Sequence, residues 1–228
     1  MWQAASTWAS EAAAIFAKEW RCELRSRYAL STLALFAFTT LVVVSISLGP
    51  IGVARSKGSV LLPVLLWLIL LFALAAGLPR AFVHEEESKT AAALRLAATP
   101  SALYCGKLLF GLSLTALLEA LITPLFIAMT SLSVGAPGLL VGTLAAGGVG
   151  LAAGSTLVAA IIGQAKSRGN LFAVMAFPVL LPLLLLAIEL TQNAAEGVVA
   201  GVALPQLLLY DASVTVVGLM LFPAVWNP

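Results

Sequence analysis

The residues in this chain that could do chemistry are few and scattered. The only histidine, His84, precedes three acids at 85–87, and the two cysteines, Cys22 and Cys105, lie far apart. A metal site or a Ser/His/Asp triad needs several such groups close together, so a solvated surface position for His84 is favoured over a ligand role. The sequence also has no G-x-x-x-x-G-K-[ST] phosphate loop. We therefore expect no catalytic residue, no metal site and no directly bound cofactor.

Glu119 is the one carboxylate that lies deep inside an apolar stretch. A charge is costly in lipid, so Glu119 should be neutral, paired or facing water, and such acids are functional candidates. The alternative is a structural hydrogen bond to a neighbouring helix. Because no second acid or base is expected at the same depth, we favour packing over a proton relay.

The composition predicts an all-α polytopic membrane protein. The 228 residues are 61% hydrophobic and 10% charged, with a mean hydropathy of +1.07. A water-soluble domain of this length could not hide so much apolar surface, and backbone in lipid must satisfy its own hydrogen bonds as helix. Six stretches are long enough to span. They are residues 30–48, 60–82, 108–130, 139–163, 171–190 and 204–225.

The basic residues predict the orientation of these spans. Ten of the twelve lysines and arginines fall on one side, and only Arg55 and Lys57 fall on the other. Basic loops stay inside, so both termini are expected in the cytoplasm. Residues 1–29 carry three glutamates and no continuous apolar core, so we expect no cleavable signal peptide.

Residues 3–27 predict an amphipathic helix at the membrane surface. Trp8, Ala12, Ile15, Glu19 and Trp20 fall roughly at helical spacing, with basic residues elsewhere on the helical wheel. Aromatic, apolar and basic residues on one helix suit the headgroup layer. We therefore expect residues 1–29 to form a cytoplasmic interfacial helix.

The fourth span carries a row of small residues, one at every fourth position. Such a row lets another helix approach closely, either within one chain or in a second copy. The row consists of Gly138, Gly142, Ala146, Gly150 and Gly154.

The fifth span contains Pro178 and Pro182, each of which removes a backbone donor and kinks a helix. Residues 191–203 are too polar and small for an obvious span, so we expect short outer-face helices or a partial re-entry there. Acids near the outer ends of the last two spans either contact a partner protein or mark the water boundary. These acids are Glu189, Glu196 and Asp211.

Six motifs occur in an order that resembles the CcmB family. "KEWRCELRSRY" leads into the first span, which ends in "LGP", and "RAFVHEEE" follows the second. "ATPSALYCGKLL" enters the third span, and "GQAKSRGN" and "FPVLLPLLLL" follow the fourth. Over nearly its whole length the chain thus resembles the membrane subunit of the haem-related ABC transporter of cytochrome c maturation.

The resemblance implies an ABC-2 (type-II exporter-like) permease, with one transmembrane domain over residues 1–228, in the bacterial inner membrane. Two copies would pair with two copies of the CcmA ATPase and associate with CcmC and CcmD. ATP hydrolysis by CcmA would drive release of haem-loaded CcmE from CcmC. ATP would bind the partner ATPase and haem would be handled by the complex, while no nucleic-acid partner is implied.

The resemblance also gives the polar segment 84–100 a role, that of a coupling helix seated in a groove of the ATPase. The sequence from 92 to 96 is a strong helix former, an apolar stripe runs along it, and Pro100 ends it. The candidate coupling residues are Glu85, Glu86, Glu87, Ala91, Leu94, Arg95, Ala98 and Pro100.

Two other functions are compatible with the pattern. An ABC permease of this type could export a drug, a lipid or a polysaccharide. A membrane-embedded transferase or scaffold belongs to a different class, and an enzyme would need several acids or histidines converging at one depth, where the sequence offers only Glu119.

Overall fold

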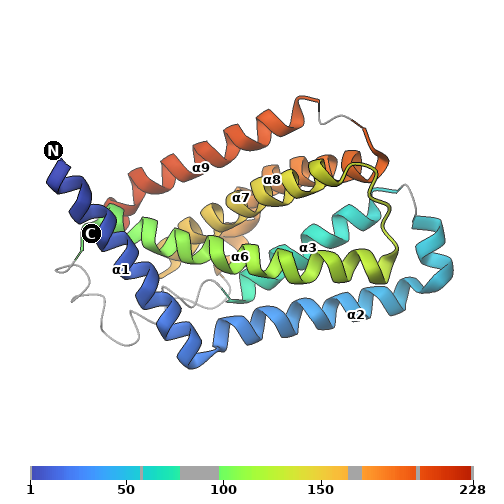
Figure 1. Ribbon diagram of the computed structural model, residues 1–228, viewed down its shortest axis with the longest axis horizontal. Coiled ribbons are helices and arrows are strands. Elements are labelled where there is room, and N and C mark those ends of the chain that lie inside the picture. The colour runs from blue at the N-terminus through green and yellow to red at the C-terminus, as the bar shows by residue number, and fades with distance from the viewer. Residues whose placement is uncertain (1, 57–58, 78–97, 164–170, 199–200, 227–228) are drawn as a thin grey trace.

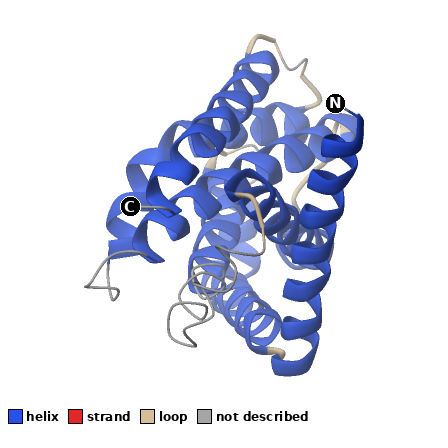
Figure 2. Ribbon diagram, turned by 90° about the vertical axis from the view of Figure 1, so that its left-hand side faces the viewer, coloured by secondary structure: helices blue, strands red, loops and turns tan. Residues whose placement is uncertain are grey.

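The computed structural model describes residues 2–56, 59–77, 98–163, 171–198 and 201–226, which are almost entirely helical (Figures 1 and 2). No strand occurs among these residues, which confirms a helical protein. The helices are α1 (Trp2–Ser26), α2 (Tyr28–Ser56), α3 (Leu61–Gly77), α6 (Pro100–Thr130), α7 (Pro137–Gly163), α8 (Leu171–Glu196) and α9 (Ala203–Trp226).

Five of the described helices, α2, α6, α7, α8 and α9, are long and apolar enough to cross a membrane, which confirms a multi-pass protein. The remaining expected span, residues 60–82, corresponds to α3, which has 17 residues and is shorter than a usual span. Its expected end, from residue 78 onward, lies outside the described residues.

Helix α7 lies at the centre of the bundle and is the most deeply buried of the five candidate spans. It packs against α6, α8 and α9. Its middle is built from glycine and alanine, and small residues allow neighbouring backbones to approach closely where lipid provides no hydrophobic driving force. The sequence of α7 thus accounts for its central place.

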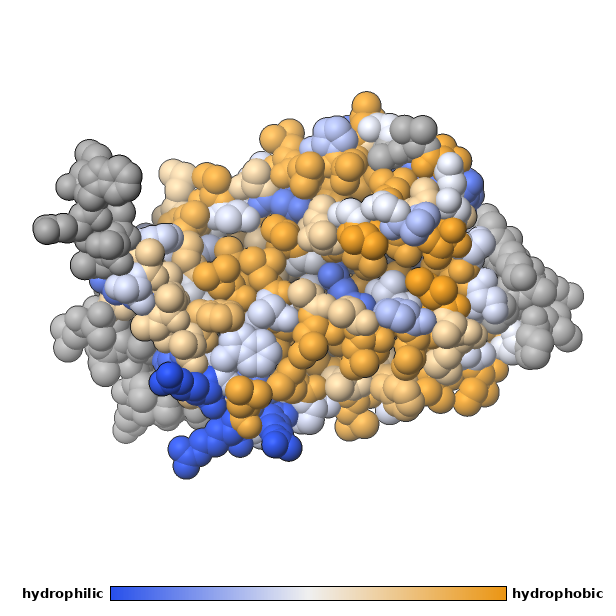
Figure 3. All heavy atoms as spheres, viewed as in Figure 1, coloured by the Kyte–Doolittle hydropathy of each residue, from blue (hydrophilic) through white to orange (hydrophobic). Residues whose placement is uncertain are grey.

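The outer helices present large apolar side chains, as lipid-facing surfaces do. Leu35 and Ile46 of α2 and Leu209 and Met220 of α9 are exposed. Figure 3 shows hydrophobic residues over most of one face, while hydrophilic residues gather at its lower left, where α1 meets α2 in Figure 1.

Helix α2 extends beyond the first expected span, residues 30–48. Gly49 has φ 56° and ψ −179°, and the helix bends there and resumes as far as Ser56. The left-handed φ is one that glycine adopts without steric cost, which places the bend at this residue.

Helix α8 also extends further than expected, which corrects the prediction for residues 191–203. It continues to Glu196 and ends in a Schellman motif, with Gly197 at φ 75° and the Val198 N–H donating to the Asn193 carbonyl (2.9 Å). After the end of α8, Gly201 has φ 56° and α9 begins at Ala203. The described part of this segment is therefore a helix end and a short turn.

Candidate functional site

The coupling residues expected in the polar segment cannot be placed, because Glu85, Glu86, Glu87, Ala91, Leu94 and Arg95 all lie outside the described residues. The structure does show how this segment enters the membrane domain. Ala98 is half-buried against the core, and Pro100 is the first residue of α6. Thr99 precedes it with extended backbone angles, φ −69° and ψ 142°. Proline suits the first helical position, where no N–H partner is needed.

Helix α1 forms hydrogen bonds with the start of α6 and with the residue before it. The backbone N–H and the hydroxyl of Thr99 both donate to Oε2 of Glu11, at 3.0 and 2.9 Å. One turn before Glu11, the Trp8 indole N–H donates to the Ser101 hydroxyl (3.1 Å). A charged acceptor roughly doubles the strength of a hydrogen bond, so Glu11 attaches Thr99, next to the end of the polar segment, to α1.

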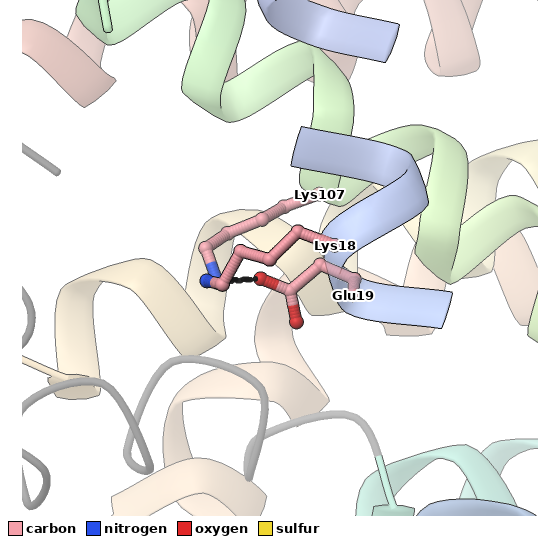
Figure 4. Close-up of polar contacts among 3 residues, drawn as sticks. All are labelled: Lys18, Glu19 and Lys107. Atoms are coloured by element: carbon pink, nitrogen blue, oxygen red, sulfur yellow. Dashed lines mark hydrogen bonds and ion pairs between the residues drawn. The ribbon is translucent and has the colours of Figure 1, made fainter. Parts of the chain in front are cut away.

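A buried ion pair joins the two helices two turns further along (Figure 4). Oε1 of Glu19 lies 3.1 Å from Nζ of Lys107 and 3.1 Å from Nζ of Lys18. The side chains of Lys107 and Glu19 are only 1% and 8% exposed, whereas Lys18 is 38% exposed. Burial alone would raise the pKa of Glu19, but the ammonium groups of Lys107 and Lys18 outweigh it and hold the pKa of that carboxyl below its usual range.

Close packing continues the contact between α1 and α6. Ile15 lies so near Gly106 that a Cβ added there would be 2.7 Å from the Cβ of Ile15 and 2.8 Å from the Ala12 carbonyl oxygen. Further along, the Trp20 indole N–H donates to the Ser113 hydroxyl (3.0 Å). The Trp20 ring also meets Phe110 edge-on, with ring centroids 5.8 Å apart. Helix α1 is thus fixed to α6 over the first four turns of α6.

The other end of α1 turns into the membrane through a single residue, Arg27, which has a left-handed φ of 53°. Glu23 is buried at this elbow, and its Oε1 accepts a hydrogen bond from the Leu30 N–H (2.8 Å) near the start of α2. A carboxylate at a helix N-terminus satisfies a free N–H and interacts favourably with the helix dipole. Helix α1 therefore links the start of α2 to the start of α6.

The depressed pKa of Glu19 predicts how acid affects this site. The stabilisation is complete above the ordinary glutamate value of about 4.3 and is lost as the pH falls through the lower folded value. We expect the difference in thermal unfolding temperature between the wild type and Glu19→Gln in detergent to stay constant from pH 8 to 5. The difference should shrink below pH 4, where both carry a neutral side chain. A difference that shrinks above pH 5 would contradict the prediction.

The structure corrects the expected environment of α1. Its face with Ala12, Ile15 and Glu19, predicted to lie on the headgroup layer, is buried against α6. Lys107 was missed because it was counted only among the basic residues beside the third span, although α6 begins seven residues before it. A signal existed, since Glu11, Ile15, Glu19 and Glu23 form one row at a spacing of four, and acids in such a row face a polar partner.

The small-residue row of α7 is packed at one end only. Ala146 is buried, and a Cβ on Gly150 or Gly154 would overlap side chains of α8, Leu183 and Leu180 respectively. A Cβ on Gly138 or Gly142 would meet nothing within 4 Å, so no helix of the described residues lies close to this end of the row.

Two further glycines, outside the predicted row, also make room in the middle of α7. A Cβ on Gly147 would overlap the ring of Trp67, whose indole N–H donates to the Thr191 hydroxyl (2.8 Å). A Cβ on Gly148 would lie 2.8 Å from both carboxylate oxygens of Glu119. The glycines in the middle of α7 therefore make room for a bulky side chain of α3 and a polar side chain of α6, in addition to the leucines of α8.

Glu119 is not the only buried acid in the bundle, which corrects a premise of the sequence reasoning. Asp211, expected near the outer water boundary, is 4% exposed and faces Gly150 of α7, while Glu119 is 7% exposed and faces Gly148. Two residues along α7 are about 3 Å along its axis, so the acids lie at similar depth on opposite sides of α7. Among the described residues, Oε1 of Glu119 and both carboxylate oxygens of Asp211 have no hydrogen-bond partner.

The other two outer acids lie where an exposed group is expected. Glu189 and Glu196 are both exposed on α8. Gln192 donates a hydrogen bond to Glu196 at the end of the helix. A contact of Glu189 or Glu196 with a partner protein stays a prediction.

Comparison with known proteins agrees with this architecture. The family model described as "CcmB protein" matches residues 10–225, from α1 to the last turn of α9. No curated protein matches the chain. The family match covers more than half of the sequence, and the helical, multi-pass fold fits it. The chain belongs to the CcmB family, a membrane permease component of cytochrome c maturation ABC transporters that is not itself catalytic.

Proposed function

We propose that this chain transmits the ATP-driven movement of a partner ATPase, CcmA, into the membrane, and so drives release of haem-loaded CcmE from CcmC. The observation that carries the proposal is the attachment of Thr99 to Glu11, supported by the buried Glu19–Lys107 pair. The polar segment 84–100 ends at this attachment. A partner that pulled on the segment would move α1 and α6 together.

Helix α1 is suited to transmit movement because it is held firmly both to α6 and to α2. On one side, α1 and α6 share a buried ion pair and close packing at Gly106, and sliding one helix along the other would break both contacts. On the other side, the single residue Arg27 and the cap from Glu23 join α1 to α2. Packed elements of this kind shift as units between discrete arrangements.

The remaining features of the proposal are what membership in the family suggests. We place both termini and segment 84–100 in the cytoplasm, in the bacterial inner membrane, with six spans in an ABC-2 type fold. Two copies of the chain work with two copies of CcmA, and with CcmC and CcmD. ATP is bound by CcmA, and haem is handled by the assembled complex. The exposed acids Glu189 and Glu196 are candidates for the contact with the haem-handling partner on the outer face.

Replacing Leu94 with aspartate tests the coupling role. A charge introduced into the apolar contact with the ATPase should weaken assembly by about 3 kcal/mol, or roughly a hundredfold in the dissociation constant. The measurement is the amount of CcmA that co-purifies with the tagged chain from membranes. Ala92→Asp is the matched control, because it adds the same charge on the opposite side of the predicted helix. Equal recovery of CcmA with Leu94→Asp and the wild type would refute the coupling role.

A further inference from the structure

The last turns of α1 present a basic face directed away from the rest of the protein. Arg21, Leu24 and Arg25 share one side of the helix, at a spacing of three and four residues, and all are exposed. The buried residues Glu19 and Glu23 lie on the opposite side, toward α6 and the elbow. Leu24 is 59% exposed and lies between the two arginines on this side of the helix. Arg27, in the turn that follows, is also exposed, and we name Arg21, Leu24, Arg25 and Arg27 together the elbow face.

The positive charge of the elbow face is not neutralised within the described part of the chain. No ion pair there involves Arg21, Arg25 or Arg27. The acids of α1 are engaged elsewhere: Glu11 binds Thr99, and Glu19 binds two lysines. Three guanidinium groups therefore remain for an external partner.

The position of the elbow face identifies the partner as lipid. A candidate membrane span begins at Tyr28, directly after Arg27. Tyr28 is 43% exposed, and the first large side chain exposed further along α2 is Leu35, about 10 Å away at 1.5 Å per residue. This distance places Tyr28 and the adjacent Arg27 at the level of the headgroups when Leu35 lies in the hydrocarbon, and Arg21 and Arg25 lie within two helical turns of Arg27. Figure 3 shows the hydrophilic end of α1 directly beside the hydrophobic surface.

We propose that Arg21, Arg25 and Arg27 form a binding site for the headgroup of an anionic phospholipid, with Leu24 and Tyr28 against its glycerol and upper acyl region. The guanidinium group matches a phosphate with two parallel hydrogen bonds, and it carries less hydration than an ammonium group. An exposed leucine and tyrosine between arginines suit the boundary between headgroups and acyl chains. An acidic protein surface would explain the arginines but not the exposed leucine that lies between them on the helix.

The full chain, purified in an uncharged detergent, allows a direct test. Phosphatidylglycerol is titrated into the micelles and thermal unfolding is followed, with phosphatidylcholine of the same acyl chains as the lipid control. We expect stabilisation by phosphatidylglycerol alone. The midpoint is the phosphatidylglycerol concentration that gives half of the maximal stabilisation. In Arg21→Gln/Arg25→Gln this concentration should rise roughly thirtyfold, since each basic residue near an anionic surface contributes about a factor of five. Arg27 is left unchanged because its left-handed backbone fixes the elbow.

The matched control is Lys166→Gln/Arg168→Gln, which removes the same charge from the connection between α7 and α8. This control should keep the wild-type midpoint. Arg21→Lys/Arg25→Lys keeps the charge but loses the guanidinium shape, so its midpoint should lie between the midpoints of the two glutamine variants. An equal loss in both glutamine variants would mean general attraction to an anionic surface without a site. Stabilisation by inorganic phosphate to the same extent would identify a soluble anion as the ligand. Normal lipid response with loss of CcmA binding in Arg21→Gln/Arg25→Gln would identify a protein partner. Each of these three results overturns the proposal.

Discussion

Gly150→Leu should prevent the chain from folding. A Cβ at this position already overlaps the carboxylate of Asp211 on α9 and the side chain of Leu183 on α8, and leucine adds three further carbons to it. Both neighbours are buried, so neither can move aside into lipid or water. Overpacking typically costs about 1 to 3 kcal/mol, and here the added side chain meets two buried neighbours at once, so we expect the upper end of that range or more. Size-exclusion chromatography of the detergent extract should show loss of the monodisperse peak.

Gly142→Leu is the control for this prediction. It lies two turns earlier on the same helix, where a Cβ would meet nothing within 4 Å. We expect this variant to fold and elute as the wild type does. A folded Gly150→Leu protein that supports cytochrome c maturation would show that α7 is not held between α8 and α9 as described.

Lys107→Met should release α1 from α6. The variant removes the more buried partner of the Glu19–Lys107 pair and leaves Glu19 with Lys18, which is 38% exposed and so contributes little. Removing one partner of a buried ion pair typically costs about 3 to 5 kcal/mol, because the remaining charge is buried without compensation. The measurement is the rate of trypsin cleavage after Arg21 and Arg25, which should rise together with a fall in thermal stability.

The double variant Glu19→Gln/Lys107→Met separates the charge from the packing. A neutral glutamine beside a methionine removes the uncompensated charge, so much of the lost stability should return. Lys107→Arg is a second control that keeps the charge while changing the shape. If Lys107→Met resists trypsin as well as the wild type does, the ion pair does not hold α1 in place.

The overall class of this protein could be read from its sequence, because lipid leaves few choices. A backbone in hydrocarbon must be helical, so apolar length alone predicted the five helices that are long enough to span. The end of α8 was missed because residues 191–196 are polar, although Gly197 is a typical helix-ending residue. These polar residues were interpreted as the end of the helix, although they mark only the end of its apolar surface.

The buried positions of Asp211 and Glu19 were not predicted from the sequence. Asp211 belongs to a row of buried residues on α9 at spacings of three and four, and that row was visible in the sequence. It comprises Ala203, Leu207, Asp211, Val214, Gly218 and Phe222. The pairing of Glu19 with Lys107 could not be predicted from spacing, because the two residues are 88 positions apart. Only the packing of α1 on α6 brings them together.

That separation along the chain sets the order in which the protein can be assembled. Helix α1 is synthesised first, yet its partner residues on α6 emerge only after α2, α3 and the polar segment. At about 5 to 20 residues per second, the 88 residues between Glu19 and Lys107 take roughly 4 to 18 s to synthesise. During this interval α1 has no native partner on α6, and its row of acids is open to chaperones and proteases. Packing of α1 on α6 therefore requires that the chain has been made and inserted as far as α6, so a nascent chain that stalls before α6 leaves the α6-facing side of α1 uncovered.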